Sequence, residues 1–121
     1  MPFDPARLLA RKDVLGLSAQ QVEQLTTLEK GARAGMTAAI RQIRAERAAI
    51  AAGLKVDAPD TVQLKRHYNA LQTAAGTAHW ARLSTTLQAR AVLTEAQRGK
   101  VLGWAAERGG RWYSKGHGNR L

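Results

Sequence analysis

The chain has 121 residues, 45% of them hydrophobic and none of them cysteine, and its 19 basic residues against 9 acidic ones give a formal net charge of +10. This length suits a single domain, and the lack of cysteine excludes disulfides, thiolate metal sites and cysteine nucleophiles. The positive charge favours an acidic partner such as nucleic acid, an anionic membrane surface or an acidic protein, although a solvated charged surface needs no partner. The longest nearly apolar run, residues 48–54, is too short to cross a membrane.

The N-terminal region predicts a disordered leader followed by a short helix. Residues 1–5 include two prolines, and chain termini of this kind are often disordered. They show neither the basic nor the apolar segment of a signal peptide. A short helix is expected over residues 6–14, and Gly16 suits the left-handed position that follows a helix. We expect one helical domain over residues 6–108.

The segment Leu17-Ser18-Ala19-Gln20-Gln21 predicts the start of a long helix, because it has the pattern of a capping box. In a capping box the hydroxyl oxygen accepts a hydrogen bond from the N–H three residues on, and the Gln side chain reaches back to the cap N–H. The helix is expected to continue to about Ala52, with apolar residues at steps of three and four. Gly31 and Gly35 share one face of it and permit either a close helix crossing or a bend.

The polar side of this helix carries a run of basic residues. Arg41, Arg44 and Arg47 are spaced three apart, so they repel one another and cost helix stability. We therefore interpret this side as a candidate binding surface, with a solvated charged face as the alternative. The residues expected to capture a partner are Arg33, Arg41, Arg44 and Arg47, and those expected to make apolar contacts are Met36, Ile40 and Ile43. A role in a hairpin or dimer core is an equal alternative for the apolar three.

A second long helix is expected from about residue 58 to 91, with Asp57 as its N-cap. It carries His67 and His79, the candidate metal ligands. Their separation along the sequence places them about 18 Å apart on an ideal helix, so they cannot share one ion within a chain. A metal site would need donors from other helices or from a second protomer. The further candidate donors are Glu23, Glu29, Met36 and His117.

The segment Leu93-Thr94-Glu95-Ala96-Gln97 repeats the capping-box pattern and predicts a last helix that ends at about Glu107. Residues 109–121 are rich in glycine and basic residues, and we expect them to form a flexible basic tail. No enzyme is expected, because the carboxylates are scattered and the sequence has neither a phosphate-cradling loop nor a nucleophile elbow.

With its two motifs, the chain resembles the small all-helical envelope stress proteins of the Spy/CpxP type, which are named for a repeated Leu-Thr-x-x-Gln motif. The second motif matches in full and the first has Ser18 in place of Thr. The resemblance spans roughly residues 8–108. It implies an all-α fold, an elongated hairpin of one short, two long and one shorter helix, paired antiparallel into a cradle-shaped dimer. We assign an architectural role to Leu17, Ser18, Gln21, Leu93, Thr94 and Gln97.

The resemblance also implies a function. It implies a periplasmic, ATP-independent holdase chaperone that needs no cofactor and binds unfolded or acidic client proteins, with an envelope sensor protein as a further partner. A periplasmic heavy-metal sensor is an alternative, because relatives of this type include such sensors. A basic nucleic-acid-binding protein is the other alternative, although no recognised nucleic-acid-binding module accompanies the charge.

Overall fold

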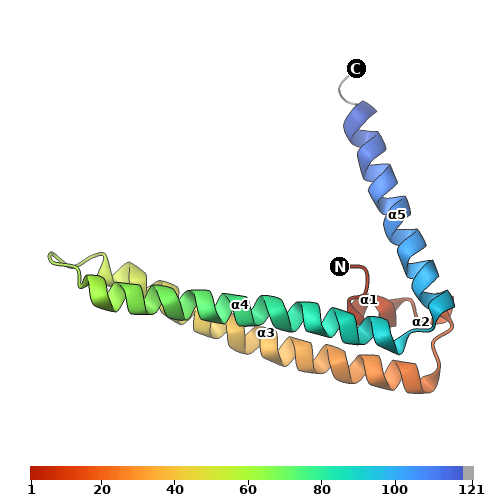
Figure 1. Cartoon of the computed structure of the whole chain (residues 1–121), viewed down its shortest axis with the longest axis horizontal. Coiled ribbons are helices and arrows are strands. Elements are labelled where there is room, and N and C mark those ends of the chain that lie inside the picture. The colour runs from red at the N-terminus through yellow and green to blue at the C-terminus, as the bar shows by residue number, and fades with distance from the viewer. Residues whose placement is uncertain (119–121) are drawn as a thin grey trace. The chain divides into compact units, whose positions relative to one another are not determined.

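The computed structural model describes residues 1–118, and residues 109–118 by their backbone alone. This part of the chain forms five α-helices and no strand (Figure 1), which confirms the predicted all-α class. The helices are α1 (Pro5–Ala10), α2 (Lys12–Leu15), α3 (Ala19–Gly53), α4 (Thr61–Val92) and α5 (Glu95–Gly118). The chain divides into two compact units. We call residues 1–29 with 85–121 the terminal unit, and residues 30–84 the hairpin unit.

The hairpin unit consists of the second part of α3 and most of α4, which run antiparallel and are joined by residues 54–60. The half-buried residues of α3 here recur mainly at steps of three, four and seven, and most of them are small: Ala32, Ala39, Ile43, Glu46, Ala49, Ile50 and Gly53. On α4 the facing positions are again rich in alanine, and Ala74 is the one that is fully buried, with 6% exposed. Two helices alone can bury only one stripe each, so this unit has a thin core.

The start of α4 differs from the prediction. Asp60, rather than Asp57, caps it: Oδ1 of Asp60 accepts hydrogen bonds from the N–H groups of Val62 at 3.1 Å and Gln63 at 3.2 Å. The physical reason lies in Pro59, because a residue that precedes a proline is disfavoured in the helical region. Ala58 therefore stays outside the helix, which begins after the proline, at Thr61.

The terminal unit holds the main apolar core. Its buried residues come from the N-terminal segment, α1, α2 and the adjoining parts of α3, α4 and α5: Phe3, Leu8, Leu15, Leu25, Ala89, Leu93 and Val101. Leu25 and Val101 are the largest fully buried side chains. Because this core joins residues near the N-terminus, such as Phe3 and Leu8, to residues as far along the chain as Val101, the unit is held by long-range packing.

Two expectations for the N-terminal region are corrected. Residues 1–5 are an ordered part of the terminal unit, because Phe3 is buried at 5% exposed and Pro5 opens α1, where its missing N–H leaves no hydrogen bond unmade. The expected short helix is divided into α1 and α2 at Arg11, whose φ of −113° is not helical. Gly16 has the left-handed φ of 66° that the sequence predicted, and the N–H of Leu17 bonds back to Lys12 O at 3.0 Å as in a Schellman ending.

The last helix is longer than predicted. Its backbone continues past Glu107 to Gly118, over most of the segment that we expected to be a flexible tail. Extending an existing helix adds one hydrogen bond for each residue that is ordered, so glycines weaken the helix without necessarily ending it. The remaining three residues of that predicted tail, 119–121, lie outside the described part of the chain.

Candidate functional site

Both capping boxes that the sequence predicted are present. In the first, Ser18 N–H donates to Gln21 Oε1 at 2.9 Å and Gln21 N–H donates to Ser18 Oγ at 3.1 Å. In the second, Thr94 N–H donates to Gln97 Oε1 at 2.9 Å and Gln97 N–H donates to Thr94 Oγ1 at 3.2 Å. Each pair satisfies two backbone donors that the first turn of a helix leaves without partners.

The two motifs also bind each other, which sequence reasoning missed. Gln21 Nε2 donates to Gln97 Oε1 at 2.8 Å, and Gln97 Nε2 donates to Gln21 Oε1 at 3.2 Å. Each amide also reaches the backbone ahead of the other motif: Gln21 donates to Val92 O at 3.0 Å, and Gln97 donates to Leu15 O at 3.2 Å and Gly16 O at 3.4 Å. We call Ser18, Gln21, Thr94 and Gln97 the motif junction.

The motif junction is saturated with hydrogen bonds and carries no titratable group. Gln97 is only 8% exposed, and within the described residues no buried side-chain nitrogen or oxygen lacks a hydrogen-bond partner. Its amide oxygen accepts two hydrogen bonds and its amide nitrogen serves three acceptors. The two amides are thus fully used in hydrogen bonds that join one helix start to the other, and the role of the junction is structural.

Arg98 adds a second link beside the junction. Its Nε donates to Arg90 O at 3.1 Å and its Nη2 donates to Leu93 O at 2.9 Å. Arg90 O lies in the last turn of α4 and Leu93 O directly after it, where a cation is favoured by the helix dipole. This capping role of Arg98 was not predicted from the sequence.

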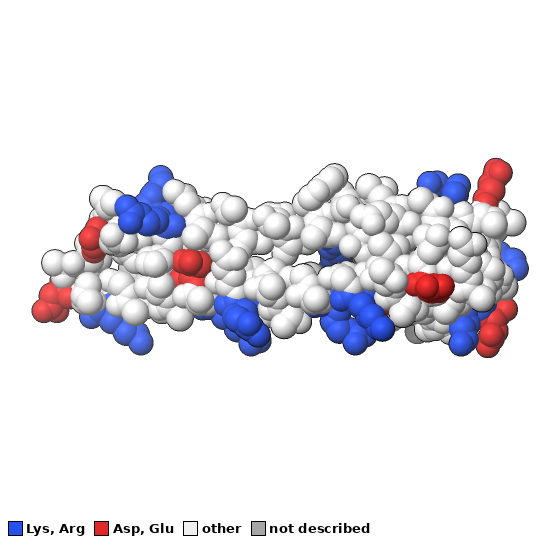
Figure 2. Space-filling model, turned by 90° about the horizontal axis from the view of Figure 1, so that it is seen from below, with Lys and Arg blue, Asp and Glu red and all other residues white. Residues whose placement is uncertain are grey.

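The predicted capture residues lie on the exposed side of α3 in the hairpin unit. Arg33, Arg41, Arg44 and Arg47 are all exposed. Met36 and Ile40 are also exposed, at 37% and 41%. On an ideal helix Met36, Ile40, Arg33, Arg44 and Arg47 fall within an arc of about 80°, and Arg41 lies about 60° beyond it. We call these six residues the basic face. Figure 2 shows Lys and Arg side chains standing out from the helices with few acidic groups between them.

Ile43 is placed differently from Met36 and Ile40. It is half-buried and lies on the stripe of α3 that includes Ile50. Its position favours the alternative role, in the hairpin core, over direct contact with a partner. The structure thus separates the three apolar residues into two exposed ones beside the arginines and one that faces inward.

The two candidate metal ligands are not brought together. Nδ1 of His67 lies 2.7 Å from Oε2 of Glu46, and the two side chains are 36% and 21% exposed. His79 is exposed, and among the described residues no three His, Cys, Asp or Glu side chains gather in one place. Glu46 was missed as the partner of His67. It is the one acid between Gly31 and Lys55, and pairing the helices about residues 54–60 would have found it.

The fold and the motif junction define the chain as an all-α protein whose two capping-box motifs are joined by hydrogen bonds. The family model for heavy-metal resistance matches residues 2–100, and the chain belongs to this family. The family is part of the Spy/CpxP-like group of periplasmic all-α proteins and is not known for catalysis. No curated protein and no solved structure matches the chain. Within the described residues, no helix combines the length and the apolar content that crossing a membrane requires.

The donor set on the described residues does not fit a metal ion held by one chain. A zinc site uses at least three protein ligands, whereas Glu46 and His67 supply two. A heavy-metal site built on this pair would need donors other than the His, Cys, Asp and Glu side chains that the described part of the chain brings near it.

Proposed function

We propose that the protein is an ATP-independent holdase-type chaperone of the periplasm, that it binds unfolded or acidic client proteins, and that its two motifs are the Leu-Thr-x-x-Gln motifs of the Spy/CpxP group. The observation that carries the proposal is the basic face of α3, where arginines and two exposed apolar side chains share one side of a helix. A surface that combines both kinds of group suits a partner that is acidic and partly unfolded.

The basic face suggests capture in two stages. The net charge of +10 attracts acidic chains over long range and raises the rate of encounter. Met36 and Ile40 then contact apolar side chains that an unfolded client exposes. Because the apolar area at these two residues is small, each contact is weak, and the client remains free to leave or fold.

The test is suppression of aggregation without ATP, followed by light scattering from an acidic, destabilised client. The first variant replaces Arg33, Arg41, Arg44 and Arg47 with Gln. The matched control replaces four exposed basic residues outside the basic face with Gln, and so removes the same charge: Lys55, Lys65, Arg66 and Lys100. We expect the first variant to require several times more protein for equal suppression, and the control to behave like the unmodified chain. No suppression by the unmodified chain at severalfold molar excess would contradict the chaperone proposal.

A periplasmic heavy-metal sensor is the second candidate, favoured by the family's description and by the contact between His67 and Glu46. Calorimetric titration with Zn²⁺ or Ni²⁺ tests it. Binding at micromolar affinity or tighter that is lost in both His67→Ala and Glu46→Ala would support the sensor. Such binding with no change in the two variants would exclude this pair as the site.

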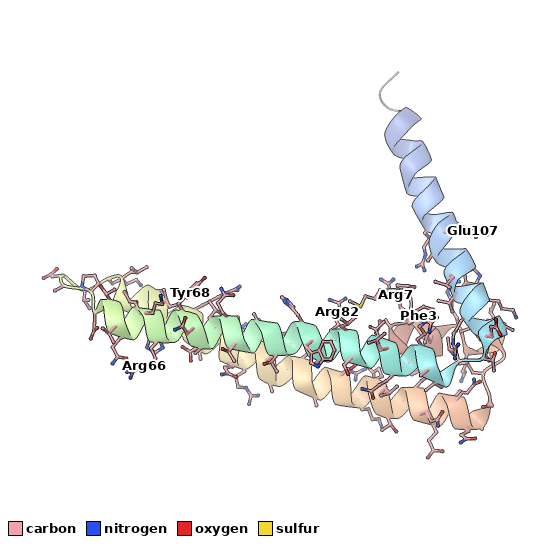
Figure 3. The ribbon with its side chains drawn as sticks, viewed as in Figure 1. Phe3, Arg7, Arg66, Tyr68, Arg82 and Glu107 are labelled. Carbon is pink, nitrogen blue, oxygen red and sulfur yellow. The ribbon has the colours of Figure 1, made fainter. Side chains whose placement is uncertain are left out.

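We further propose that two copies pair through α4. Beyond the first turn of α4, three of its large apolar residues are exposed in the hairpin unit, namely Tyr68, Trp80 and Leu83, at 52%, 63% and 41%. Figure 3 shows Tyr68 and the basic Arg66 projecting from opposite sides of α4. Burying such side chains in a second copy would stabilise a hairpin whose own core is thin.

A further inference from the structure

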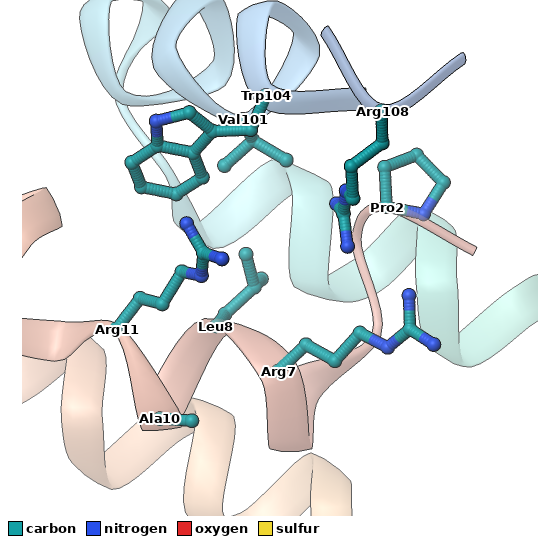
Figure 4. Close-up of a pocket in the computed structure, with 8 residues that line it drawn as sticks. All are labelled: Pro2, Arg7, Leu8, Ala10, Arg11, Val101, Trp104 and Arg108. Carbon is teal, nitrogen blue, oxygen red and sulfur yellow. The ribbon is translucent and has the colours of Figure 1, made fainter. Parts of the chain in front are cut away.

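The terminal unit contains a cavity of about 200 Å³ that the proposed function does not use. It is bounded by the N-terminal segment, α1 and α5. Leu8 and Val101 form an apolar floor, and each is 2% exposed. Figure 4 shows Trp104 above Arg11 on one side of Leu8, and Arg7 and Arg108 on the other side. We call this space the α1–α5 cavity.

Three guanidinium groups surround the cavity without a counter-charge. Arg7, Arg11 and Arg108 line it, and no carboxylate does. Among the described residues none of the three has an ion-pair partner within 4.0 Å. Like charges that gather around a low-dielectric wall raise the local positive potential and attract anions. Guanidinium groups also match the two oxygens of a carboxylate or phosphate with paired hydrogen bonds.

The remaining lining is apolar and aromatic. The Cζ atom of Arg11 lies 4.5 Å from the centroid of the Trp104 ring, so a cation–π contact holds this guanidinium at the wall. The buried floor of Leu8 and Val101 offers apolar contact but no hydrogen bond. A cavity of about 150 Å³ is known to hold a benzene molecule, so the α1–α5 cavity has room for a body of that size.

We infer that the α1–α5 cavity binds a small organic anion, in which one carboxylate or phosphate group is attached to an aromatic body. The anionic group lies between Arg7 and Arg108, and the ring packs on Leu8 and Val101 beside Trp104. This site is distinct from the basic face, because all of its residues belong to the terminal unit, whereas the basic face belongs to the hairpin unit.

The first experiment titrates the full chain with benzoate, phenyl phosphate, acetate and benzyl alcohol. Binding is measured by calorimetry and by the NMR shift of the Trp104 indole N–H. We expect benzoate or phenyl phosphate to bind at one site per chain and to shift the Trp104 signal. Acetate lacks the ring and benzyl alcohol lacks the charge, so each should bind at least tenfold more weakly. Equal affinity for benzoate and benzyl alcohol, or for benzoate and acetate, would overturn the inference.

The second experiment compares arginine variants. Arg7→Gln and Arg108→Gln should each weaken the tighter aromatic anion at least fivefold. The matched control, Arg66→Gln, removes the same charge from an exposed residue of the hairpin unit outside the basic face and should leave the affinity unchanged. Arg108→Lys keeps the charge without the paired donors and should give an intermediate loss. Circular dichroism is the control that each variant is folded. If Arg66→Gln weakened binding as much as Arg108→Gln, the effect would be one of net charge and the cavity would not be the site.

Discussion

Glutamine at residues 21 and 97 does what few other side chains could do. Its amide both accepts and donates, so one group can close its own capping box and also bind the other motif. At Gln97 the oxygen accepts from Thr94 N–H while the nitrogen donates to Leu15 O. Glutamate has the same shape but no donor when it is ionised, and would face carbonyl oxygens with a negative charge.

Gln97→Ala should lower the free energy of unfolding by about 2–3 kcal/mol, because it leaves buried backbone groups without partners. Urea denaturation measures the loss. Gln24→Ala is the control, since Gln24 is exposed on the first turns of α3, and should change the free energy by less than about 0.5 kcal/mol. A double-mutant cycle of Gln21→Ala and Gln97→Ala should show a coupling of about 0.5–3 kcal/mol. Strict additivity of the two losses would show that the amide pair contributes nothing.

Arg98→Ala should cost about 1 kcal/mol of unfolding free energy, because the terminal carbonyls of α4 lose a charged donor. Arg98→Lys keeps the charge but not both donors, and should recover part of the loss. Thermal unfolding of the three proteins at the same salt concentration makes the comparison. A Lys variant as unstable as the Ala variant would show that the paired contacts to Arg90 O and Leu93 O matter more than the charge.

At the scale of the element, α3 and α4 depend on modest packing over a long length. Alanine is the most frequent residue at their facing positions, and interior glycines weaken both helices. An alanine Cβ at Gly31, Gly35 or Gly76 would meet no atom within 4 Å, so these glycines do not serve a close crossing within the chain. At Gly53, by contrast, a Cβ would lie 2.7 Å from Cδ2 of Leu64, so this glycine allows the helices to approach at the hairpin end.

Gly35→Ala and Gly76→Ala should each raise the free energy of unfolding by up to about 1 kcal/mol, the usual difference between these residues inside a helix. Gly16→Ala is the contrasting control. Gly16 has a φ of 66°, so alanine there should destabilise by about 1 kcal/mol. Thermal melts followed by circular dichroism test whether the first two substitutions stabilise the protein and the third destabilises it. If Gly35→Ala or Gly76→Ala destabilised the protein, the glycine would have to contact a second copy.

At the scale of the whole molecule, charge and exposed apolar surface support the two association proposals. The chain carries +10, yet the thin core of the hairpin unit leaves Trp80 and Leu83 in contact with solvent. Salt screens the electrostatic attraction between the protein and an acidic client. Apolar contact between two copies depends little on salt. Client capture and pairing should therefore respond differently to ionic strength.

Suppression of aggregation by the unmodified chain should weaken as ionic strength rises from about 0.05 M to about 0.5 M, because the screening length falls well below 10 Å. An uncharged or basic client is the control and should show little change. The measurement is the amount of protein that halves the scattering signal at each salt concentration. Equal suppression of the acidic client across this range would show that capture does not depend on the basic face.

Trp80→Glu combined with Leu83→Glu should shift the protein from dimer to monomer in sedimentation velocity, because charge would replace the apolar side chains of the proposed contact. Val62→Glu is the control, since Val62 is 67% exposed in the first turn of α4, away from these two residues along the helix. A dimer that survives the double substitution would place the contact elsewhere. A monomeric unmodified chain would contradict the pairing proposal itself.

The sequence alone determined the helix class, the two capping boxes and the left-handed Gly16. Each of these depends on residues within four or five positions of one another, because helical hydrogen bonds and caps are local. Helical periodicity also predicted that the arginines of α3 lie on the polar, exposed side of that helix. The resemblance in the two motifs identified the Spy/CpxP-like group, which the heavy-metal resistance family match supports.

Only the tertiary structure decided which distant residues meet. It paired Gln21 with Gln97 and Glu46 with His67, buried Phe3 in the core, and placed Arg7 and Arg108 around one cavity. None of these contacts can be derived from local spacing, since each joins segments whose approach depends on the packing of other helices. The physical reason is that helices form from short-range hydrogen bonds, whereas a binding site forms where long-range burial of apolar surface brings their ends together.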